Sequence, residues 1–355
     1  MAIFSLRLQN FRLYKDESFE FEPGVNIVVG PNTAGKTTLL EAITVLATGS
    51  SYKARDGALI RHGAPWARAE GYFKSGNRVV KIVSQGELII KNFVVDGRPY
   101  KRLLLERQVP IVLFEPEQLQ LLSRGPEQRR EYFDDLLERS LSGYGTIRRQ
   151  YKRVLAQRNA LLKRGPGSGA KQLFAWNLRL SELGGKIAVA RAGLVQDINA
   201  GLSRSYSRIA GQRVRVEARY ESQFGPGNYS SRLLAKLEAA AELDMLRGFT
   251  AYGPHREDIA FYLAGRPLSQ SASRGETRSL LLALKLYELA LIEASRGQKP
   301  IFLLDDVFSE LDRARRRALI KHLKNYQTII TTTDADAVLE YFAGEHNIVP
   351  LSKSV

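Results

Sequence analysis

The sequence predicts an α/β fold in which a P-loop nucleotide-binding core, made of a mixed sheet and an antiparallel β meander, is interrupted by a helical second lobe. Three observations predict it. A strand, a glycine loop and a helix follow one another from Val25, and the apolar run at 301–304 ends in two carboxylates. Between them, the hydrophobic spacing becomes helical from Pro126. We therefore expect lobe I at 1–125 and 296–355, and lobe II at 126–295.

The first 125 residues read mostly as strands and turns. Phe4, Leu6 and Leu8 alternate as in an amphipathic strand, and they do not form the apolar core of a signal peptide. The stretch "RVVKIVSQGELIIKNFVVDGRPY" alternates in the same way. Its Asp96-Gly97 dipeptide is a hairpin turn signal. This part of the chain therefore predicts the β meander.

The glycine loop fits the spacing G-x-x-x-x-G-K-T from Gly30 to Thr37, between a β-branched strand and a helix. Its amides and the helix N-terminus would present positive partial charge to a polyphosphate. Lys36 would contact the β- and γ-phosphates, and the Thr37 hydroxyl would ligate Mg²⁺. The predicted nucleotide contacts are Gly30, Pro31, Asn32, Thr33, Ala34, Gly35, Lys36, Thr37 and Thr38.

The strand "IFLLDD" delivers Asp305 and Asp306 at its carboxyl end. We expect Asp305 to be the second Mg²⁺ ligand beside Thr37, because a second strand supplies such a carboxylate in P-loop proteins. Asp306 would orient or deprotonate the attacking water, with Lys36 as the other catalytic residue. A final strand, "TIITTT", is predicted from Thr328.

The composition limits the class of protein. The chain has 355 residues with 44% hydrophobic and 25% charged residues, and no cysteine, which excludes disulfides and thiolate zinc sites. The apolar helix from Leu280 contains Lys285 and Glu288 and is too short to span a bilayer. We expect a cytoplasmic protein without a membrane partner. The net charge of +16 predicts a polyanionic partner, nucleic acid ahead of an anionic membrane surface, and the alternative is a merely solvated basic surface.

The basic residues concentrate in one helical segment. No acidic residue occurs from Arg139 to Ser181, and the helix spacing of its apolar residues leads to the break "GPGSGAK". Such a helix would bind a phosphate backbone in a salt-sensitive and sequence-tolerant way. The predicted DNA contacts are Arg148, Arg149, Lys152 and Arg153.

The stretch "SASRGETRSLLLALKL" has two interpretations. Ser273 and Glu276 fit a helix capping box. Alternatively, Ser273 and Gly275 form a helix N-terminus that presents an anion site to another molecule. Their position between the phosphate loop and "LLDD" favours the second interpretation. This order of motifs resembles that of ABC-type ATPase heads, in which such a Ser-Gly loop closes over the γ-phosphate bound by the other protomer.

Five ordered stretches resemble the hallmarks of the RecF family of bacterial DNA replication and repair ATPases. They are "QNFRLYKDESFEFEPGVNIVVGPNTAGKT", "PIVLFEPEQLQLLSRGPEQRREYFDD", "QRNALLK", "YGPHREDIAFYLAGRPLSQSASRGETRSLLLALKL" and "LLDDVFSELD". The resemblance implies a head similar to those of SMC proteins, without a long coiled coil. It also implies weak DNA-dependent ATP hydrolysis, an ATP-dependent homodimer that clamps DNA, and a location on the nucleoid. The implied task is repair at single-strand gaps and duplex junctions during the SOS response to DNA damage, where RecO and RecR help RecA to load.

The chain departs from the family pattern at two positions. Thr33 stands where the family usually has Gly, and a β-branched residue tolerates a positive φ poorly. Glu276 stands where the family has Gln, so its carboxylate either weakens ATP-driven pairing or serves as the cap. In the loop "FEPEQL", Glu115 or Gln118 could reach Mg²⁺ or water, and the sequence does not choose between them.

Three further residues leave alternatives open. Arg129 and Arg130 would contact DNA, or would pair with Glu131, Asp134 and Asp135 at helical spacing. His255 in "GPHR" has no neighbouring His to suggest a metal site, and its role is not derivable from the sequence. At the level of the whole chain, the alternatives to a DNA clamp are an ABC-type head that powers a membrane or nuclease partner, and a monomeric basic P-loop NTPase.

Overall fold

The computed structural model describes every residue except 165–169, 226, 324, 335, 343–345 and 353–355. The described chain divides into two compact units, which we call the split unit and the inserted unit. The split unit comprises Met1–Leu119 and Lys285–Val355, and the inserted unit comprises Gln120–Leu284. The sequence predicted functional lobes at 1–125 with 296–355 and at 126–295. These lobe bounds stay a prediction.

A parallel sheet forms one layer of the split unit. Its order is β14-β3-β13-β12-β8, and each described neighbour pair runs parallel. Its inner strands β3, β13 and β12 are buried almost throughout, as expected for parallel strands covered on both faces, whereas the edge strand β14 is mostly exposed. Their bounds are Val25–Val29 (β3), Ile111–Phe114 (β8), Ile301–Asp305 (β12), Thr328–Thr332 (β13) and His346–Pro350 (β14).

An antiparallel sheet forms the second layer of the split unit, in the order β2-β1-β4-β5-β6-β7. The predicted hairpin is confirmed: Asp96 and Gly97 adopt φ values of 49° and 77°, and β6 pairs with β7 around them. Its strands are Ile3–Phe11 (β1), Tyr14–Glu20 (β2), Trp66–Phe73 (β4), Gly76–Gln85 (β5), Leu88–Val95 (β6) and Arg98–Tyr100 (β7).

The helix α1, Lys36–Thr48, joins the two sheets into one core. It contacts β4 and β5 of the antiparallel sheet and β8, β12 and β13 of the parallel sheet. A helix between two layers must be apolar on all sides, and its residues from Leu39 to Ala47 are all buried. The smaller elements of this unit are η1 (Asp56–Leu59), η2 (Leu105–Arg107), η3 (Pro116–Gln120, at its boundary), α9 (Val307–Glu310), α10 (Arg313–Leu323) and α11 (Asp336–Leu339).

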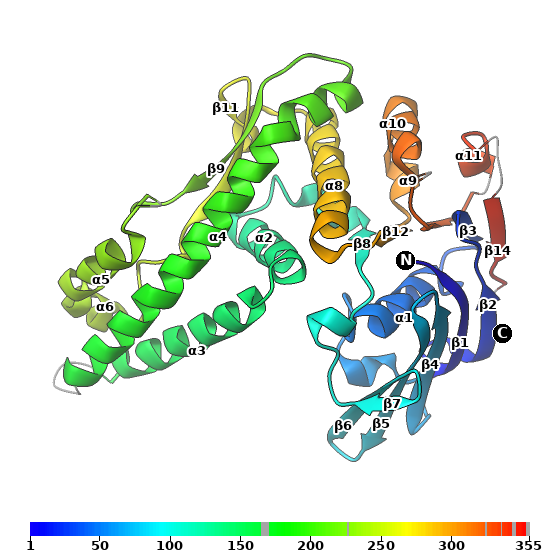
Figure 1. Ribbon diagram of the computed structural model, residues 1–355, viewed down its shortest axis with the longest axis horizontal. Helices are drawn as coiled ribbons and strands as arrows, with labels where there is room; N and C mark the ends of the chain where they lie inside the picture. The colour runs from blue at the N-terminus through cyan, green and yellow to red at the C-terminus, as the bar shows by residue number, and fades with distance from the viewer. Residues whose placement is uncertain (165–169, 226, 324, 335, 343–345, 353–355) are drawn as a thin grey trace. The chain divides into compact units, whose positions relative to one another are not determined.

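The inserted unit is built on one long helix, α4 (Ala170–Ala210), which contacts α2, α3, α5 and β9 (Figure 1). The predicted helical insertion is thereby confirmed, and the break "GPGSGAK" lies mostly outside the described residues. The unit also contains a three-stranded antiparallel sheet, β11-β10-β9. Its other elements are α2 (Pro126–Ser140), α3 (Tyr144–Leu162), β9 (Val216–Glu221), α5 (Tyr229–Ala239), α6 (Ala241–Arg247), β10 (Asp258–Leu263), β11 (Arg266–Pro267) and α7 (Leu268–Ser271).

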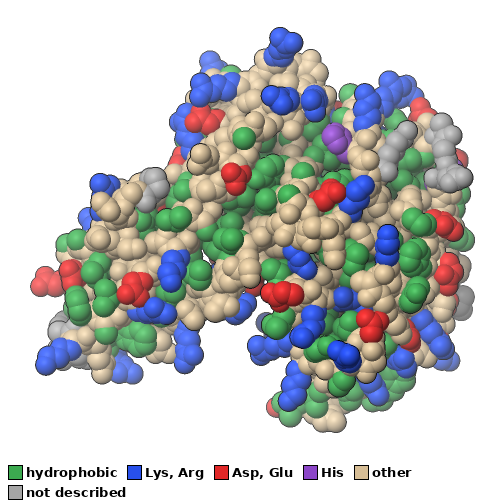
Figure 2. Space-filling view, in the orientation of Figure 1, with side chains coloured by type: hydrophobic (Ala, Val, Ile, Leu, Met, Phe, Trp, Pro, Cys, Tyr) green, Lys and Arg blue, Asp and Glu red, His purple; other side chains and the backbone are tan. Residues whose placement is uncertain are grey.

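The apolar helix of the sequence is α8, Arg274–Arg296, and the boundary between the two units falls within it. Its Lys285 ammonium is buried, where it donates to the Leu113 carbonyl at 2.8 Å and to Glu288 at 2.9 Å. Among the described residues, no helix combines the length and apolarity needed to cross a bilayer. Lys and Arg side chains are spread widely over the face shown in Figure 2.

Candidate nucleotide-binding site

The phosphate loop connects β3 to α1, and its two glycines are required by close neighbours. Gly35 has a φ of 96°, and a Cβ there would lie 2.6 Å from the Tyr14 hydroxyl. That hydroxyl donates a hydrogen bond to the Gly35 carbonyl at 3.1 Å. A Cβ on Gly30 would lie 2.9 Å from the Leu351 side chain. Side chains at either position would therefore push the loop away from its sheet.

The remaining loop residues differ in exposure. Pro31, Asn32 and Thr33 are exposed, whereas Ala34 and Lys36 are buried at the start of α1, together with Thr38. Thr33 has a φ of 74°. The positive φ anticipated at this position is present, so a β-branched residue occupies a left-handed conformation that favours glycine.

We expect Thr33→Gly to stabilise the split unit. Relief of the left-handed strain is worth about 1–2 kcal/mol, and the extra freedom of glycine in the unfolded chain offsets part of it. A net gain near 1 kcal/mol should appear in urea unfolding followed by Trp66 fluorescence in a Trp176→Phe chain. Thr33→Ala is the matched control, because it keeps a Cβ and should gain clearly less. Equal gains for the two variants would show that the strain does not arise from the side chain.

The Lys36 ammonium is held inside the loop. Its Nζ donates to the carbonyls of Gly30 at 2.9 Å and Pro31 at 3.2 Å, and it lies 4.0 Å from Asp306 Oδ2. The side chain is only 5% exposed. The amine is thus held by the same loop that would receive a polyphosphate, beside the predicted water-activating carboxylate.

The register of the parallel sheet brings distant residues together at its carboxyl edge. Thr331 pairs with Asp305 across β13 and β12, and Thr332 pairs with Val29 of β3, just before the loop. The Thr37 hydroxyl donates to Asp305 Oδ1 at 3.1 Å, although 268 residues separate them. Thr331 Oγ1 donates to the same oxygen at 3.0 Å. The sequence placed Thr37 and Asp305 in one site, and the structure brings them into contact.

These oxygens fit a magnesium ion. Mg²⁺ prefers hard oxygen ligands and keeps several waters, so a hydroxyl and one carboxylate are a typical protein contribution. No group of three or more His, Cys, Asp or Glu side chains gathers into another metal site within the described part of the chain. When bound, the ion would neutralise charge on the β- and γ-phosphate oxygens.

Asp306 occupies a constrained position next to this pair. Its φ is 52°, and its N–H donates to Thr331 Oγ1 at 2.9 Å. Burial raises the pKa of its carboxyl above the usual value, with Asp305 adding to the shift and Lys36 opposing it. The side chain keeps 39% of its exposure, so water can reach it.

The "FEPEQL" loop also faces Asp305. Burial raises the pKa of Glu115, and the nearby charges of Glu117 and Asp305 raise it further while Lys53 lowers it. Gln118 Oε1 is buried and has no hydrogen-bond partner in the structure. Either residue could thus serve the ion or the water, and the choice between them stays open.

The sequence interpretation missed two side chains of this site. The Tyr52 hydroxyl donates to Asp305 Oδ2 at 3.2 Å, and Lys53 Nζ lies 3.7 Å from the same oxygen. Both follow α1 in "GSSYKARDG", which carries no recognisable motif. The only signal available was their position shortly after the helix that begins at the phosphate loop.

Ser273 and Glu276 form the capping box at the start of α8. The Ser273 N–H donates to Glu276 Oε2 at 2.7 Å, and the Glu276 N–H donates to Ser273 Oγ at 3.2 Å. The capping interpretation is therefore confirmed for this chain, and it explains the carboxylate at 276. A role for Ser273 and Gly275 at another protomer's nucleotide stays a prediction.

The basic segment needs a correction. Arg148 is 7% exposed and pairs with Glu131 at 2.9 Å and Glu138 at 3.3 Å, with Asp135 beside them. Arg158 is fully buried and donates to Asp244 at 2.7 Å. Arg148 is thus an internal ion-pair residue of the unit, and its predicted DNA contact is disfavoured. Arg149, Lys152 and Arg153 are exposed on α3, so the DNA-contact prediction continues with them.

Arg129 and Arg130 do not have the partners on α2 that the ion-pair alternative predicted. The Arg129 guanidinium forms a two-pronged pair with Asp258 of β10, at 3.0 and 2.6 Å. Arg130 donates to the Glu257 carbonyl at 2.7 Å. The partners lie in another motif, and not one turn away on α2. "PEQRREYFDD" and "GPHRED" are thus joined in space as the interior of the inserted unit.

His255 and Glu257 belong to the same interior. His255 Nε2 donates to the Thr250 carbonyl at 3.1 Å, and its Nδ1 accepts from the Tyr151 hydroxyl at 2.7 Å. Burial lowers the pKa of His255 to about 4, so the ring is neutral at neutral pH. Glu257 accepts from the hydroxyls of Tyr229 and Ser222 at 2.8 and 2.7 Å. These contacts give the "GPHRED" residues a structural role.

Known proteins match this chain over nearly its whole length. A protein-family model described as an AAA domain matches residues 5–164. A relative from Heliobacterium modesticaldum, the DNA replication and repair protein RecF, is 37% identical over 349 residues, which cover 95% of this chain and 94% of the relative. The solved structure of the recombination mediator protein RecF with ATP, in the RecFOR pathway, superposes with a TM-score of 0.84 at 29% identity and covers 94% of this chain and 92% of that chain.

A more distant likeness concerns the fold alone. The SMC head bound to the C-terminal winged-helix domain of ScpA superposes with a TM-score of 0.57 at 15% identity, covering 100% of this chain and 96% of that chain. The predicted fold class, an α/β head of this type with a helical lobe, is confirmed by these structures.

Proposed function

The chain belongs to the RecF family of DNA replication and repair proteins, and we propose that it is an ATP-switched DNA-binding protein of recombinational repair. The observation that carries this proposal is the meeting of the phosphate loop with Asp305 and Asp306 at one sheet edge. An ATPase head that powers a membrane or nuclease partner is not favoured, since the relative that matches almost the whole chain is a RecF protein.

ATP binds at the loop from Gly30 to Thr38. The loop amides and the start of α1 face the phosphates, and Lys36 leaves the carbonyls of Gly30 and Pro31 to pair with them. Thr37 and Asp305 hold Mg²⁺, and Tyr52 and Lys53 orient the Asp305 carboxylate from its other side. Binding thus exchanges the internal contacts of Lys36 for stronger, charge-assisted ones.

Hydrolysis is slow and serves as a switch. The oxygen of a water molecule bonds to the γ-phosphorus, the bond from that phosphorus to the β–γ bridging oxygen breaks, and Asp306 accepts the proton of the water. The products are ADP and inorganic phosphate. The raised pKa of Asp306 suits a proton acceptor, because a basic carboxylate takes up a proton more readily. DNA would stimulate this weak activity.

Two copies of the chain form the clamp. Ser273 and Gly275 of each protomer complete the nucleotide site of the other, so that ATP bridges the dimer. Arg149, Lys152 and Arg153 then face DNA at gaps and duplex junctions. RecR, RecO and RecA are the protein partners in this proposal, and the site of action is the nucleoid in the cytoplasm.

The test is the solution mass by light scattering of an Asp306→Asn chain, with Mg²⁺-ATP and without nucleotide. We expect a rise from 39.8 kDa to roughly twice that value, since ATP binding and dimerisation are linked. The matched control adds Ser273→Asp, which keeps an N-cap side chain but places a negative charge against the partner's γ-phosphate. It should stay monomeric. A chain that binds ATP and remains monomeric without the control substitution would leave a monomeric NTPase as the better account.

A further inference from the structure

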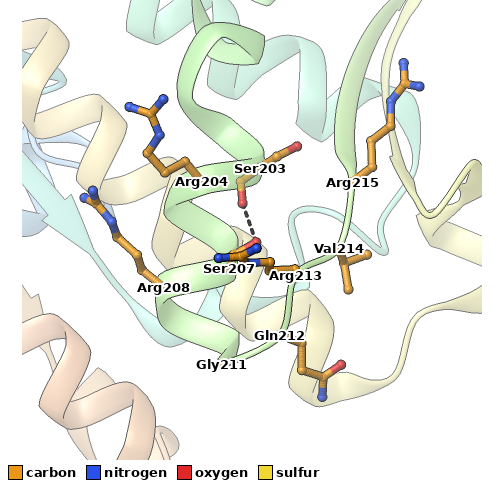
Figure 3. Close-up of a pocket in the computed structure, with 9 residues that line it drawn as sticks. All are labelled: Ser203, Arg204, Ser207, Arg208, Gly211, Gln212, Arg213, Val214 and Arg215. Carbon is orange, nitrogen blue, oxygen red and sulfur yellow. Dashed lines mark hydrogen bonds between the residues drawn. The ribbon is translucent and has the colours of Figure 1, made fainter.

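The end of α4 and the turn into β9 form a pocket lined by arginines, which we call the arginine pocket. Its charged and hydroxyl lining comprises Ser203, Arg204, Ser207, Arg208, Arg213 and Arg215. Figure 3 shows Arg204 and Arg208 leaving one side of α4, while Arg213 and Arg215 extend from the segment that leads to β9. Figure 2 shows Lys and Arg side chains in the region where the ribbon of Figure 1 places the C-terminal end of α4.

The pocket has a rigid frame. Ser203 of α4 both donates to the Val216 carbonyl and accepts from the Val216 N–H, each at 2.9 Å. One turn earlier, Asn199 makes the same reciprocal pair with Ala218, each bond at 2.8 Å. These bonds fix the start of β9 against α4, and therefore fix the spacing of the arginines on the two segments.

The charge of the pocket is not balanced from within. No acidic residue occurs in the sequence between Asp197 and Glu217, and none lines the pocket. Arg215 lies 3.5 Å from Glu217, which also pairs with Arg219. Arg204, Arg208 and Arg213 are exposed, and the described part of the chain gives none of them a carboxylate partner.

The dipole of α4 explains only some of the arginines in the pocket. Cations near a helix C-terminus interact favourably with its macrodipole, which would explain a basic residue in the last turns of α4. Arg213 and Arg215, however, lie beyond the helix end at Ala210. Arg204 and Arg208 are four residues apart, where like charges repel each other. An external anion would remove that repulsion.

We propose that the arginine pocket binds the phosphate backbone of DNA. Guanidinium groups bond phosphate oxygens in a two-pronged geometry, and several of them on a fixed frame match successive phosphates. The lining contains no aromatic side chain, so bases have nothing to stack on. The contact is therefore with the backbone and does not depend on base sequence. This inference rests on the proposed DNA-binding function and adds a second contact surface to α3.

The test measures binding of a labelled DNA duplex by the full chain, by fluorescence anisotropy over a range of salt concentrations. In the double variant Arg204→Gln/Arg208→Gln, the logarithm of the association constant should depend less steeply on the logarithm of the salt concentration. We expect the magnitude of this negative slope to decrease by about 2, as for two lost phosphate contacts. Near 0.1 M salt the affinity should fall roughly tenfold or more, equally for unrelated sequences. The control, Lys101→Gln/Arg102→Gln, removes the same charge from exposed residues of the split unit and should change little.

Each outcome decides the proposal. Equal losses in the two variants would show that net charge, and not the arginine pocket, governs binding, and would overturn it. Unchanged binding in Arg204→Gln/Arg208→Gln would overturn it as well and leave an acidic protein segment as the ligand of the pocket. If the unsubstituted chain does not bind DNA, the proposed function fails together with the inference. Unchanged unfolding midpoints and ATP-dependent mass would show that the variants remain folded.

Discussion

Asp134→Asn should cost the inserted unit about 3–5 kcal/mol of unfolding free energy, the range found when one partner of a buried ion pair is removed. The Asp134 carboxylate accepts from Arg191 Nε and Nη2, both at 2.9 Å, and from the Tyr144 hydroxyl at 2.6 Å. Arg191 is 3% exposed and Tyr144 is fully buried. Asparagine preserves the shape but leaves the Arg191 charge without a counter-charge in a place that water does not reach.

The measurement is urea unfolding followed by Trp176 fluorescence in a Trp66→Phe chain, because the protein has two tryptophans and one lies in each unit. The matched control is Glu182→Gln, which breaks the exposed pair with Arg179 on α4. An exposed pair is worth at most about 1 kcal/mol. If Asp134→Asn costs no more than this control, Arg191 must find another partner, and the ion pair does not hold α2 to α4.

Asp306→Asn should slow ATP hydrolysis about 10²–10⁴-fold, the usual contribution of a positioned general base. Asparagine has the shape of aspartate but cannot accept the proton of water. ATP binding should persist, because the loop, Lys36, Thr37 and Asp305 are unchanged. The checks are steady-state phosphate release for hydrolysis and nucleotide titration for binding, with Glu87→Gln, an exposed carboxylate of the same unit, as the control.

The pH dependence adds a second criterion. The Asp306 carboxylate acts in its deprotonated form, and its raised pKa means that protonation sets in at a higher pH than for an ordinary aspartate. The rate should therefore fall as the pH drops through this raised pKa, and the fall should vanish in the asparagine variant. Full activity in Asp306→Asn would transfer the role of base to another carboxylate, and Glu115, whose pKa is also raised by burial, is the candidate.

Local patterns predicted short structural motifs well, although the sequence favoured an anion site over the cap at Ser273 and Glu276. The phosphate loop, the strand that ends in Asp305, the Asp96-Gly97 hairpin and the Ser273–Glu276 cap each depend on a few neighbouring residues. Spacing along the chain is enough to recognise them. The meeting of the phosphate loop with Asp305 at one sheet edge follows from the rule that parallel strands present their carboxyl ends together.

The roles of the charged side chains were predicted less well. A basic residue in a helical pattern does not reveal which acidic residue it pairs with in the fold. Arg158 and Asp244 are 86 residues apart, and Arg129 and Asp258 are 129 apart. A count of charges along the α3 segment therefore assigned Arg148, a buried ion-pair residue, to a DNA surface. Conversely, Arg204 to Arg215 were not singled out, since the turn between α4 and β9 brings them together only in the fold.

The strand pairing of the split unit determines the order in which the chain can fold during synthesis. Within the parallel sheet, β3 pairs with β13 and β14, more than 300 residues later. The inserted unit is complete once residue 284 has left the ribosome. The phosphate loop, by contrast, must wait for residues 328–350 before its strand has any neighbour in the sheet. A growing chain therefore completes its inserted unit first, and a truncated product of synthesis would carry that unit without the parallel sheet that holds the phosphate loop.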